Sequence, residues 1–352
     1  MKKISKKKSL IFIVIGILIL LGIWLSYGIY WPSQPASQTQ VVVNIEKGQG
    51  LREIASNLRK EGIIKSENLF NFFALISGVQ NNLQAGKYAL SPSMNIAEIV
   101  KKLTKGETIK EKITIIEGWN LRDIGFYLEN KGIAQAEELW EIAGFPAVDY
   151  SKTSDLPKPN DFSQEFEFLK AKPENVSLEG YLFPDTYEIT PDSSVEEIVK
   201  KMLENFKEKI DSQLKEEIKK QGKTLHQILT MASLLEDEMQ NFEDRQIAAG
   251  ILWKRLENWW PLQVDATLTY ITGKPSSELT KQDLQIDSSY NTYKYYGLPP
   301  GPICNPGLEA IKAAIYYKPT SYWFYLTTPE GEAIFSRTLE EHNLARYRYL
   351  LK

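Results

Sequence analysis

Two glutamates, Glu236 and Glu238, lie in the apolar segment MASLLEDE, residues 231–238. The wider stretch at residues 230–250 has the residue spacing of an amphipathic helix. Carboxylates are seldom buried in an apolar surface unless they are paired, because removing a charge from water is costly. A carboxyl in a partly apolar setting can keep its proton near neutral pH and serve as a general acid and base. The alternative is a solvated helix face on which neither glutamate has a chemical role.

The two glutamates cannot face one cleft while the helix stays regular, because residues two apart point about 200° apart. Glu236 falls on the apolar stripe of the helical wheel, whereas Glu238 lies off it, beside Met231 and Leu234. Two interpretations of Glu236 therefore stay open: it is a buried, hydrogen-bonded support, or it is itself the acid. The stripe consists of Leu225, Ile228, Leu229, Ala232 and Leu235.

The N-terminus carries a lysine cluster followed by a long apolar segment. Residues 10–25 contain no charge and the uncharged run continues to Trp31, which is roughly the 20 residues that cross a bilayer as a helix. A cleavable signal peptide is the alternative, but it usually has a shorter apolar region and a small-residue cleavage site, which SYGIYWPS does not offer. We expect an uncleaved transmembrane helix at residues 9–31. The positive-inside rule predicts a cytoplasmic tail at residues 1–8 and an extracytoplasmic remainder.

The composition of the remainder argues against several classes of protein. Five of the 42 basic residues lie in the tail, which holds no acids, so the rest carries 37 basic and 45 acidic residues, a net charge of −8. Nucleic-acid binders normally present a basic face, so nucleic acid is not an expected partner. One cysteine, Cys304, and two histidines, His226 and His342, are too few for a typical His/Cys zinc site. We expect neither a metal nor a cofactor.

A repeat follows a short polar linker at residues 32–40. The segment that begins at Val41 resembles the one that begins at Lys112, and each predicts a strand, a glycine-containing turn and an amphipathic helix closed by glycine. Between them, LQAGKYAL predicts a strand and NIAEIVKKLTKG a capped helix. Such units fit an extracellular binding module; the alternative is that they only support the neighbouring domain. Leu51, Arg52, Ile54, Leu58, Gly62 and Ile63 recur 70 positions later as Leu121, Arg122, Ile124, Leu128, Gly132 and Ile133.

The second half of the chain mixes helices, short strands and loops. Residues 147–178 predict a loop, and one helix is expected from about Val195 to Gln221. The segment YNTYKYYGLPPGPICNPG, residues 290–307, is rich in Gly and Pro. Its tyrosines favour an ordered, irregular loop, because aromatic area is usually buried. Long ordered loops are often functional.

Six segments occur in order along this half, and together they resemble the MltG/YceG-like endolytic murein transglycosylases, membrane-anchored bacterial enzymes that cut nascent peptidoglycan. Each segment alone is weak evidence for the resemblance. All six, however, occur in order after a predicted membrane anchor whose orientation matches that of the family. The resemblance runs from the anchor to the C-terminus, and residues 41–105 are similar to the family's LysM-like domain. The segments are EGYLFPDTY (179–187), MASLLEDE (231–238), LQVDATLTY (262–270), SYNTY (289–293), GLPPGPICNPG (297–307) and FSRTLEEHN (335–343).

The resemblance implies a lytic transglycosylase, a carbon–oxygen lyase in which one glutamate acts first as acid and then as base. It protonates the glycosidic oxygen that leaves the anomeric carbon of muramic acid. It then deprotonates the 6-hydroxyl, which closes on that carbon and leaves a 1,6-anhydro end without using water. This requires a carboxyl whose pKa is raised toward neutrality. An internal hydroxyl nucleophile removes the need for the second carboxylate of ordinary glycosidases.

The family motif places the catalytic carboxylate at the second glutamate, which corresponds to Glu238, and leaves Glu236 as a supporting residue. Gln263 and Asp265 alternate with apolar neighbours, so we expect them on one face of a strand toward the sugar; the alternative for Asp265 is turn capping. Asn291 and Tyr293 are expected to hydrogen-bond or stack on sugar rings, and core packing is the alternative. We expect a local hydrogen-bonding role for His342 rather than catalysis.

The sequence therefore predicts an α+β protein with a single N-terminal transmembrane helix, a small LysM-like α/β module at residues 41–105 and a mixed α+β catalytic domain at residues 106–352. We expect an inner-membrane protein that cleaves nascent glycan strands, with penicillin-binding peptidoglycan synthases as partners. Two other classes stay open. One is a peptidoglycan-binding scaffold without catalysis, and the other is a muramidase that uses water with Asp265 as base.

Overall fold

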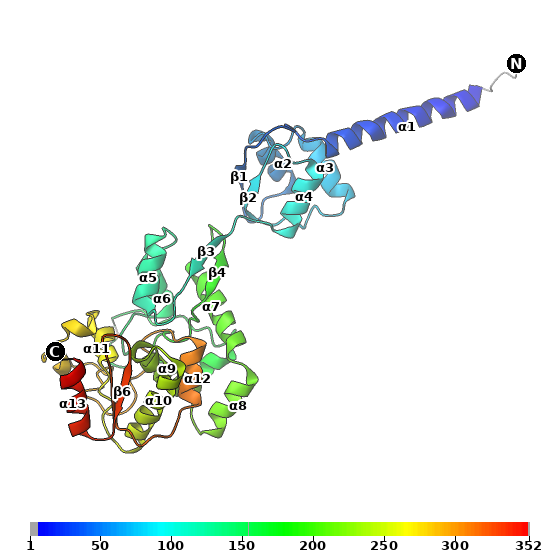
Figure 1. Ribbon diagram of the computed structural model, residues 1–352. Coiled ribbons are helices and arrows are strands. Elements are labelled where there is room, and N and C mark those ends of the chain that lie inside the picture. Colours follow the sequence, from blue (N-terminus) through cyan, green and yellow to red (C-terminus); the bar gives the residue numbers. More distant parts are fainter. Residues whose placement is uncertain (1–5, 154, 351–352) are drawn as a thin grey trace. The chain divides into compact units, whose positions relative to one another are not determined.

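The computed structural model describes residues 6–153 and 155–350 (Figure 1). It divides into two compact units, one comprising the chain up to Glu111 with Glu188–Ser193, the other Lys112–Tyr187 with the chain from Ser194 onward. The described elements are mostly helices with a few short strands, so the predicted α+β class is confirmed. Most of the predicted cytoplasmic tail, including Lys2 and Lys3, lies outside the described residues.

Helix α1 (Lys6–Tyr30) contains the apolar segment Leu10–Tyr30, which is long and apolar enough to cross a bilayer. Most of its apolar side chains are exposed. Its C-terminal end is buried against the module that follows, where Ile29 is only 5% exposed and the Tyr30 ring packs edge-on against Phe73 at 6.4 Å. Length and composition therefore agree with the expected membrane span.

The first module consists of β1 (Val41–Ile45), α2 (Leu51–Lys60), α3 (Glu67–Ile76), β2 (Gly86–Leu90) and α4 (Ile96–Lys105). The two strands pair antiparallel, from Val41 opposite Leu90 to Ile45 opposite Gly86. Alternate strand residues face the helices, because side chains alternate across a strand. Helix α4 begins with the predicted cap, in which Asn95 and Glu98 exchange hydrogen bonds, and it ends at Gly106 in the left-handed region. The core contains Val43, Ile45, Leu58, Phe70, Tyr88, Leu90, Ile99 and Leu103.

The second copy of the repeat has the same order of elements, which we call the second module. It comprises β3 (Glu111–Thr114), α5 (Leu121–Asn130), α6 (Ala136–Ala143), β4 (Thr186–Ile189) and α7 (Val195–Lys209), and β3 pairs with β4. An insertion at residues 144–185, with a short 3-10 helix at Glu167–Ala171, separates α6 from β4. The duplication is therefore complete rather than limited to its first strand and helix.

A sequence signal for the second half of this duplication is visible once the elements are aligned. Tyr88 donates its hydroxyl to the carbonyl of Gln84 at 2.8 Å, and Tyr187 donates to the carbonyl of Phe183. Each tyrosine thus bonds the residue four positions earlier. The matching residues are Tyr88, Leu90, Pro92, Ile99, Val100 and Leu103 with, 99 positions later, Tyr187, Ile189, Pro191, Ile198, Val199 and Met202.

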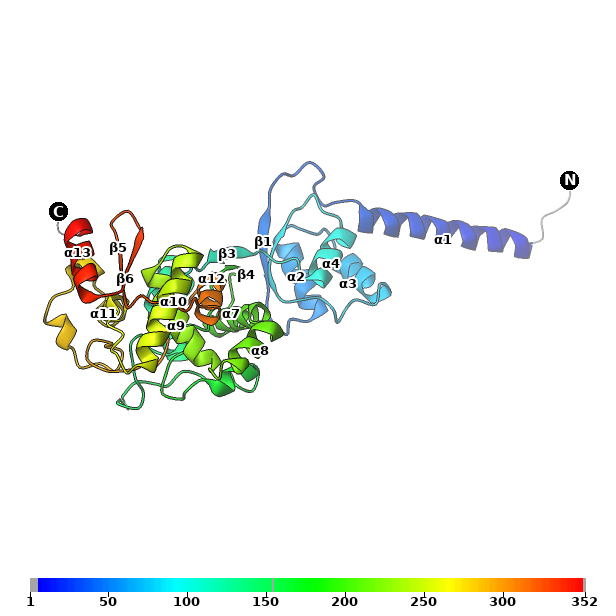
Figure 2. The same cartoon turned by 60° about the horizontal axis from the view of Figure 1, so that its bottom comes forward.

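The rest of the second unit surrounds helix α9 (Leu225–Glu238), which packs against α8 (Ser212–Lys220), α10 (Phe242–Glu257), α11 (Asp265–Thr272) and α12 (Leu308–Ile315) (Figures 1 and 2). Residues 228–235 of α9 are all buried. Strands β5 (Phe324–Thr327) and β6 (Ala333–Ser336) form an antiparallel hairpin, and α13 (Leu339–Tyr349) packs against it. Short 3-10 helices lie at Ser276–Glu278 and Asp283–Gln285.

Two predicted helices are each broken in two. The helix expected from Val195 to Gln221 is wrong, because Ile210 leaves the helical region and Asp211 caps α8 by accepting from the Leu214 amide at 2.8 Å. The helix predicted over residues 230–250 ends at Glu238, and Asn241 caps α10 by accepting from the Asp244 amide at 2.9 Å. Glu238 therefore occupies the last position of α9 and not a helix interior.

Candidate active site

The Glu236 side chain is buried, and each of its two carboxylate oxygens has a partner. Its side chain is 6% exposed and forms an ion pair with Arg245, whose side chain is 7% exposed. Its Oε2 accepts a hydrogen bond of 2.8 Å from the Gly307 amide. Burial raises the pKa of Glu236, while Arg245 and the Gly307 amide act in the opposite direction. With both oxygens bonded, this carboxylate ties α9 to α10 and to the start of α12.

Glu238 has a different environment at the end of α9. Its side chain is half-buried, and its carboxylate accepts hydrogen bonds from the Ala266 amide and the Tyr325 hydroxyl. Burial raises the pKa of Glu238 to about 7; the nearby charge of Asp265 raises it as well, and the two hydrogen bonds lower it. No cation pairs with this carboxylate among the described residues. A carboxyl with a pKa near neutrality can both donate and accept a proton at neutral pH.

Asp265 and Gln263 are exposed and Asp265 lies close to Glu238, but neither residue is on a strand. The strand expected at Leu262–Asp265 is wrong, because Gln263 has φ +53° and Asp265 begins helix α11. The segment is fixed by the 290–307 loop, where Thr292 accepts from the Gln263 amide at 3.2 Å through its carbonyl and from the Val264 amide at 3.0 Å through its hydroxyl. The predicted alternation of exposure is nevertheless correct: Leu262 and Val264 are buried while Gln263 and Asp265 face outward.

Tyr293 and Asn291, both expected to contact sugar, have different positions. Half-buried Tyr293 donates its hydroxyl to Asp265 Oδ1, so the two side chains form a pair next to Glu238. Asn291 is fully buried and donates to the carbonyls of Leu284 and Ile286 at 3.1 and 2.9 Å. Its Oδ1 accepts from the Tyr293 amide at 3.0 Å. Asn291 therefore shapes the loop that presents Tyr293 and has no surface for a ligand.

Arg255, which the sequence analysis did not single out, connects two of the segments that surround Glu238. Its guanidinium is buried and donates to the carbonyl of Leu262 at 2.6 Å and to that of Trp323 at 2.7 and 3.0 Å. It also lies 5.5 Å from the centre of the Phe324 ring. One side chain thus joins the segment that leads to Asp265 to the strand that carries Tyr325. These contacts bridge up to 68 residues, so no local pattern reveals them.

A second buried carboxyl, Glu179, belongs to the scaffold of the second unit. It accepts hydrogen bonds from Asn305 Nδ2 at 2.9 Å, the Leu121 amide at 3.0 Å and the Tyr270 hydroxyl at 3.1 Å. Asn305 is itself fully buried and its Oδ1 accepts from the amides of Gly180 and Leu182 at 2.9 and 3.1 Å. Burial raises the pKa of Glu179 to about 8. Both residues stand in the segments quoted for the resemblance, which is the one sequence signal that marks them.

The 290–307 segment is an ordered irregular loop, as predicted, and it follows helix α9 along its length. His226, near the start of α9, bonds the Pro300 carbonyl at 2.8 Å, Ser233 accepts from the Ile303 amide at 3.0 Å, and Gly307 bonds Glu236. His342 was expected to have a local hydrogen-bonding role; its Nδ1 is buried without a hydrogen-bond partner, and its ring stacks on Phe324 with the ring centroids 5.3 Å apart.

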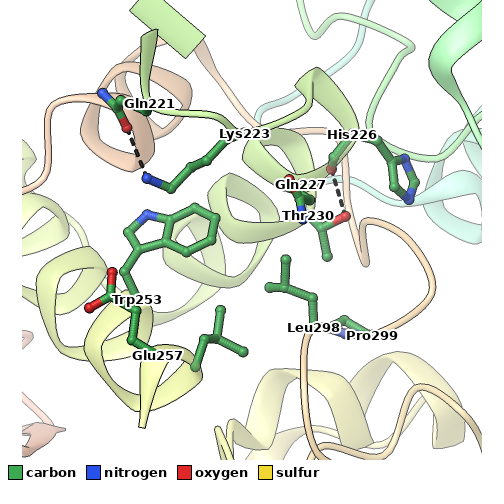
Figure 3. Close-up of a pocket in the computed structure, with 10 residues that line it drawn as sticks. Gln221, Lys223, His226, Gln227, Thr230, Trp253, Glu257, Leu298 and Pro299 are labelled. Carbon is green, nitrogen blue, oxygen red and sulfur yellow. Dashed lines mark hydrogen bonds between the residues drawn. The ribbon is translucent and has the colours of Figure 1, made fainter. Parts of the chain in front are cut away.

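A cavity of about 490 Å³ lies at the opposite end of α9 (Figure 3). None of its lining residues is one of the candidate site residues, and Thr230, its lining residue nearest to Glu238 along α9, is eight positions away, about 12 Å along a helix. Among the described residues, no group of three or more His, Cys, Asp or Glu side chains is placed to hold a metal ion. The lining includes Gln221, Lys223, His226, Trp253, Glu257 and Leu298.

Comparison with known proteins connects this geometry to a family. Residues 43–348 match the YceG-like family. A Bacillus subtilis protein named endolytic murein transglycosylase is 37% identical over 91% of this chain and 87% of its own length. A Streptococcus pneumoniae protein of the same name is 31% identical over 89% of this chain and 59% of its own length. The crystal structure of a yceG-like protein from Listeria monocytogenes superposes with a TM-score of 0.55 at 33% identity, covering 88% of this chain and 100% of that one. The chain belongs to the YceG-like family.

Proposed function

We propose that this protein is an endolytic murein transglycosylase that cleaves the bond between N-acetylmuramic acid and N-acetylglucosamine within peptidoglycan strands. The observation that carries the proposal is the contrast between its two glutamates. Glu236 is committed to Arg245 and Gly307, whereas Glu238 is free of a cation and has a pKa of about 7. The relatives named endolytic murein transglycosylase support the same reaction.

In this reaction Glu238 acts in both directions. Protonated Glu238 donates its proton to the glycosidic oxygen, and the bond from that oxygen to the anomeric carbon of muramic acid breaks. The resulting carboxylate then takes the proton of the 6-hydroxyl, whose oxygen bonds to the same carbon. The proton count closes, no water is consumed, and the product is a 1,6-anhydro end. A pKa near the working pH suits a group that must both lose and regain a proton.

The neighbouring groups have supporting roles in this proposal. Asp265 keeps a negative charge near Glu238, which favours the protonated acid before cleavage. Tyr293 holds Asp265 in place. Exposed Gln263 is the side chain that we assign to hydrogen bonding with the sugar, while Glu236 and Asn291 fix the backbone around the site.

Product analysis tests the proposal. Glycan strands are incubated with purified residues 32–352, and the new ends are identified by mass spectrometry. We expect 1,6-anhydro-muramic ends. Reducing ends that incorporate ¹⁸O from labelled water would instead show a muramidase with Asp265 as base. Unchanged strands together with retained binding would show a non-catalytic scaffold.

We also propose that the first module is a LysM-like glycan-binding domain, within a chain organised as tail, anchor, linker, residues 41–105 and residues 106–352. Its strand–helix–helix–strand order and its own core support an independent fold. A folded fragment of residues 41–105 should be retained weakly on peptidoglycan sacculi. A folded fragment that passes through unretained would leave the module with a structural role only.

The anchor is proposed to remain uncleaved in the bacterial cytoplasmic membrane, with the N-terminus inside. The length of the apolar segment Leu10–Tyr30 and the preceding lysines support this topology. Penicillin-binding peptidoglycan synthases are the partners that we propose, because the strands they release are the substrate. Protease added outside spheroplasts should remove the bulk of the protein, and the mature chain should begin at or near Met1; a mature N-terminus near Ser33 would contradict the anchor.

A further inference from the structure

The second module contacts the end of helix α9 through one turn, Glu117–Asn120, which joins β3 to α5 and which we call the EGWN turn. Gly118 in this turn has φ +84° and Gly48, its counterpart in the first module, has φ +89°. The two modules therefore build the same turn. Their side chains differ, because Trp119 stands where the first module has Gln49.

The EGWN turn is fastened to the end of α9. The Gly118 amide donates to the Asn305 carbonyl at 3.0 Å, and the Asn305 amide donates back to the Trp119 carbonyl at 2.9 Å. A Cβ added to Gly118 would lie 3.6 Å from Asp237 Oδ1 and 3.6 Å from Glu236 Cγ. The turn thus packs on the helix end whose last residue is Glu238, and only the exposed Asp237 separates Glu236 from Glu238 in the chain.

Trp119 has the properties of a sugar-stacking residue. It is half-exposed, and its ring leans on Tyr127 with centroids 5.1 Å apart, which fixes its orientation from one side. A rigid aromatic face next to exposed polar groups provides apolar contact for the C–H face of a sugar ring and hydrogen-bond partners for its hydroxyls. Exposed Glu117 in the turn and exposed Asp237 at the adjoining end of α9 can act as such partners.

We propose that the EGWN turn binds the glycan strand next to the bond that Glu238 cleaves, with one sugar ring packed on Trp119. The duplicated module would then have two uses: the first copy is the proposed LysM-like module, and the second contributes a wall to the active site. This inference rests on the proposed function, and its test separates the two.

Kinetics of the full-length protein in detergent provide the first test. Trp119→Ala should raise KM for peptide-free glycan strands about 5- to 30-fold with a smaller change in kcat, because a lost stacking contact of one to two kcal/mol corresponds to that factor. Trp119→Phe keeps a ring and should recover most of the affinity. The control is Phe126→Ala, which removes an exposed aromatic ring of the same module that packs edge-on against Trp140; its KM should stay at the wild-type value. A folded Trp119→Ala variant with wild-type KM overturns the inference.

Oxidative footprinting provides a second test that does not require the Trp119→Ala variant to fold. In the Glu238→Gln background, which holds strands without cutting them, added strands should lower the oxidation of Trp119 several-fold. Unchanged oxidation at saturating strand concentration overturns the inference. If added strands protect Trp119 from oxidation but the wild-type protein forms no anhydro ends, the proposed reaction is refuted and glycan binding at the EGWN turn is supported.

Discussion

Replacing each glutamate of the pair by glutamine should separate structural support from chemistry. Glu236→Gln removes one partner of a buried ion pair and leaves the Arg245 charge uncompensated, with both side chains less than a tenth exposed. Such a loss costs about 3–5 kcal/mol. We expect the lower end, because the amide oxygen can still accept from Arg245 or Gly307. For a domain of this size that corresponds to a fall in Tm on the order of 10 °C. Activity of the folded fraction should be reduced but present.

Glu238→Gln should do the reverse. The amide oxygen can still accept from Ala266 and Tyr325, and the substitution removes a carboxyl whose ionised form is disfavoured by burial. We therefore expect slightly higher stability at neutral pH. The loss of general acid and base assistance should lower kcat by about 10²–10⁴-fold or more. The measurements are thermal unfolding and mass-spectrometric counting of anhydro ends for purified residues 32–352.

The double variant Glu236→Gln/Arg245→Met is the matched control, because it removes the unpaired charge and should recover part of the lost stability. A Glu238→Gln variant that remains active while stably folded Glu236→Gln is inactive would assign the acid to Glu236 instead. An unchanged Tm in Glu236→Gln would show that the ion pair does not hold α9 and α10 together.

Three further predictions concern titration and the buried scaffold. The rate of cleavage should fall as pH rises through about 7, where Glu238 loses its proton. In pH–rate profiles, Asp265→Asn should move this fall to lower pH, because Asp265 raises the pKa of Glu238. Tyr325→Phe should move it to higher pH, because the Tyr325 hydrogen bond lowers that pKa. Because the folded-state pKa of Glu238 lies above its ordinary value of 4.5, its stability contribution is complete below pH 4.5 and is lost as pH rises through 7; the Tm advantage of Glu238→Gln over wild type should grow across that interval and vanish at pH 4.5. Asn305→Ala strands Glu179 Oε1 and two backbone amides in the core, so denaturant unfolding should report a loss of at least about 3 kcal/mol; a loss below 1 kcal/mol would mean that these groups find other partners.

Features that depend on local pattern could be predicted from the sequence. The uninterrupted apolar run predicted α1, and apolar spacing with glycine stops predicted both copies of the first strand and helix. The cap at Asn95 and Glu98 was readable because its two partners are three residues apart. The helix breaks at Asp211 and Asn241 also have a local sequence signal, because both residues are typical N-caps. They were missed because the apolar periodicity continues on both sides of each break.

The environments of the two glutamates depend on contacts between segments that are distant in the sequence. Glu236 is paired because Gly307, 71 residues away, and Arg245, beyond a helix break, meet it at one point. Glu238 has a pKa near 7 because α11 and β5 enclose it and bring Asp265 close. Burial and charge proximity are properties of space rather than of spacing along the chain, so a helical wheel gives the direction of a side chain but not what surrounds it. The same reason applies to Asn291, for which ligand contact and core packing were both open from the sequence and whose full burial only the fold reveals.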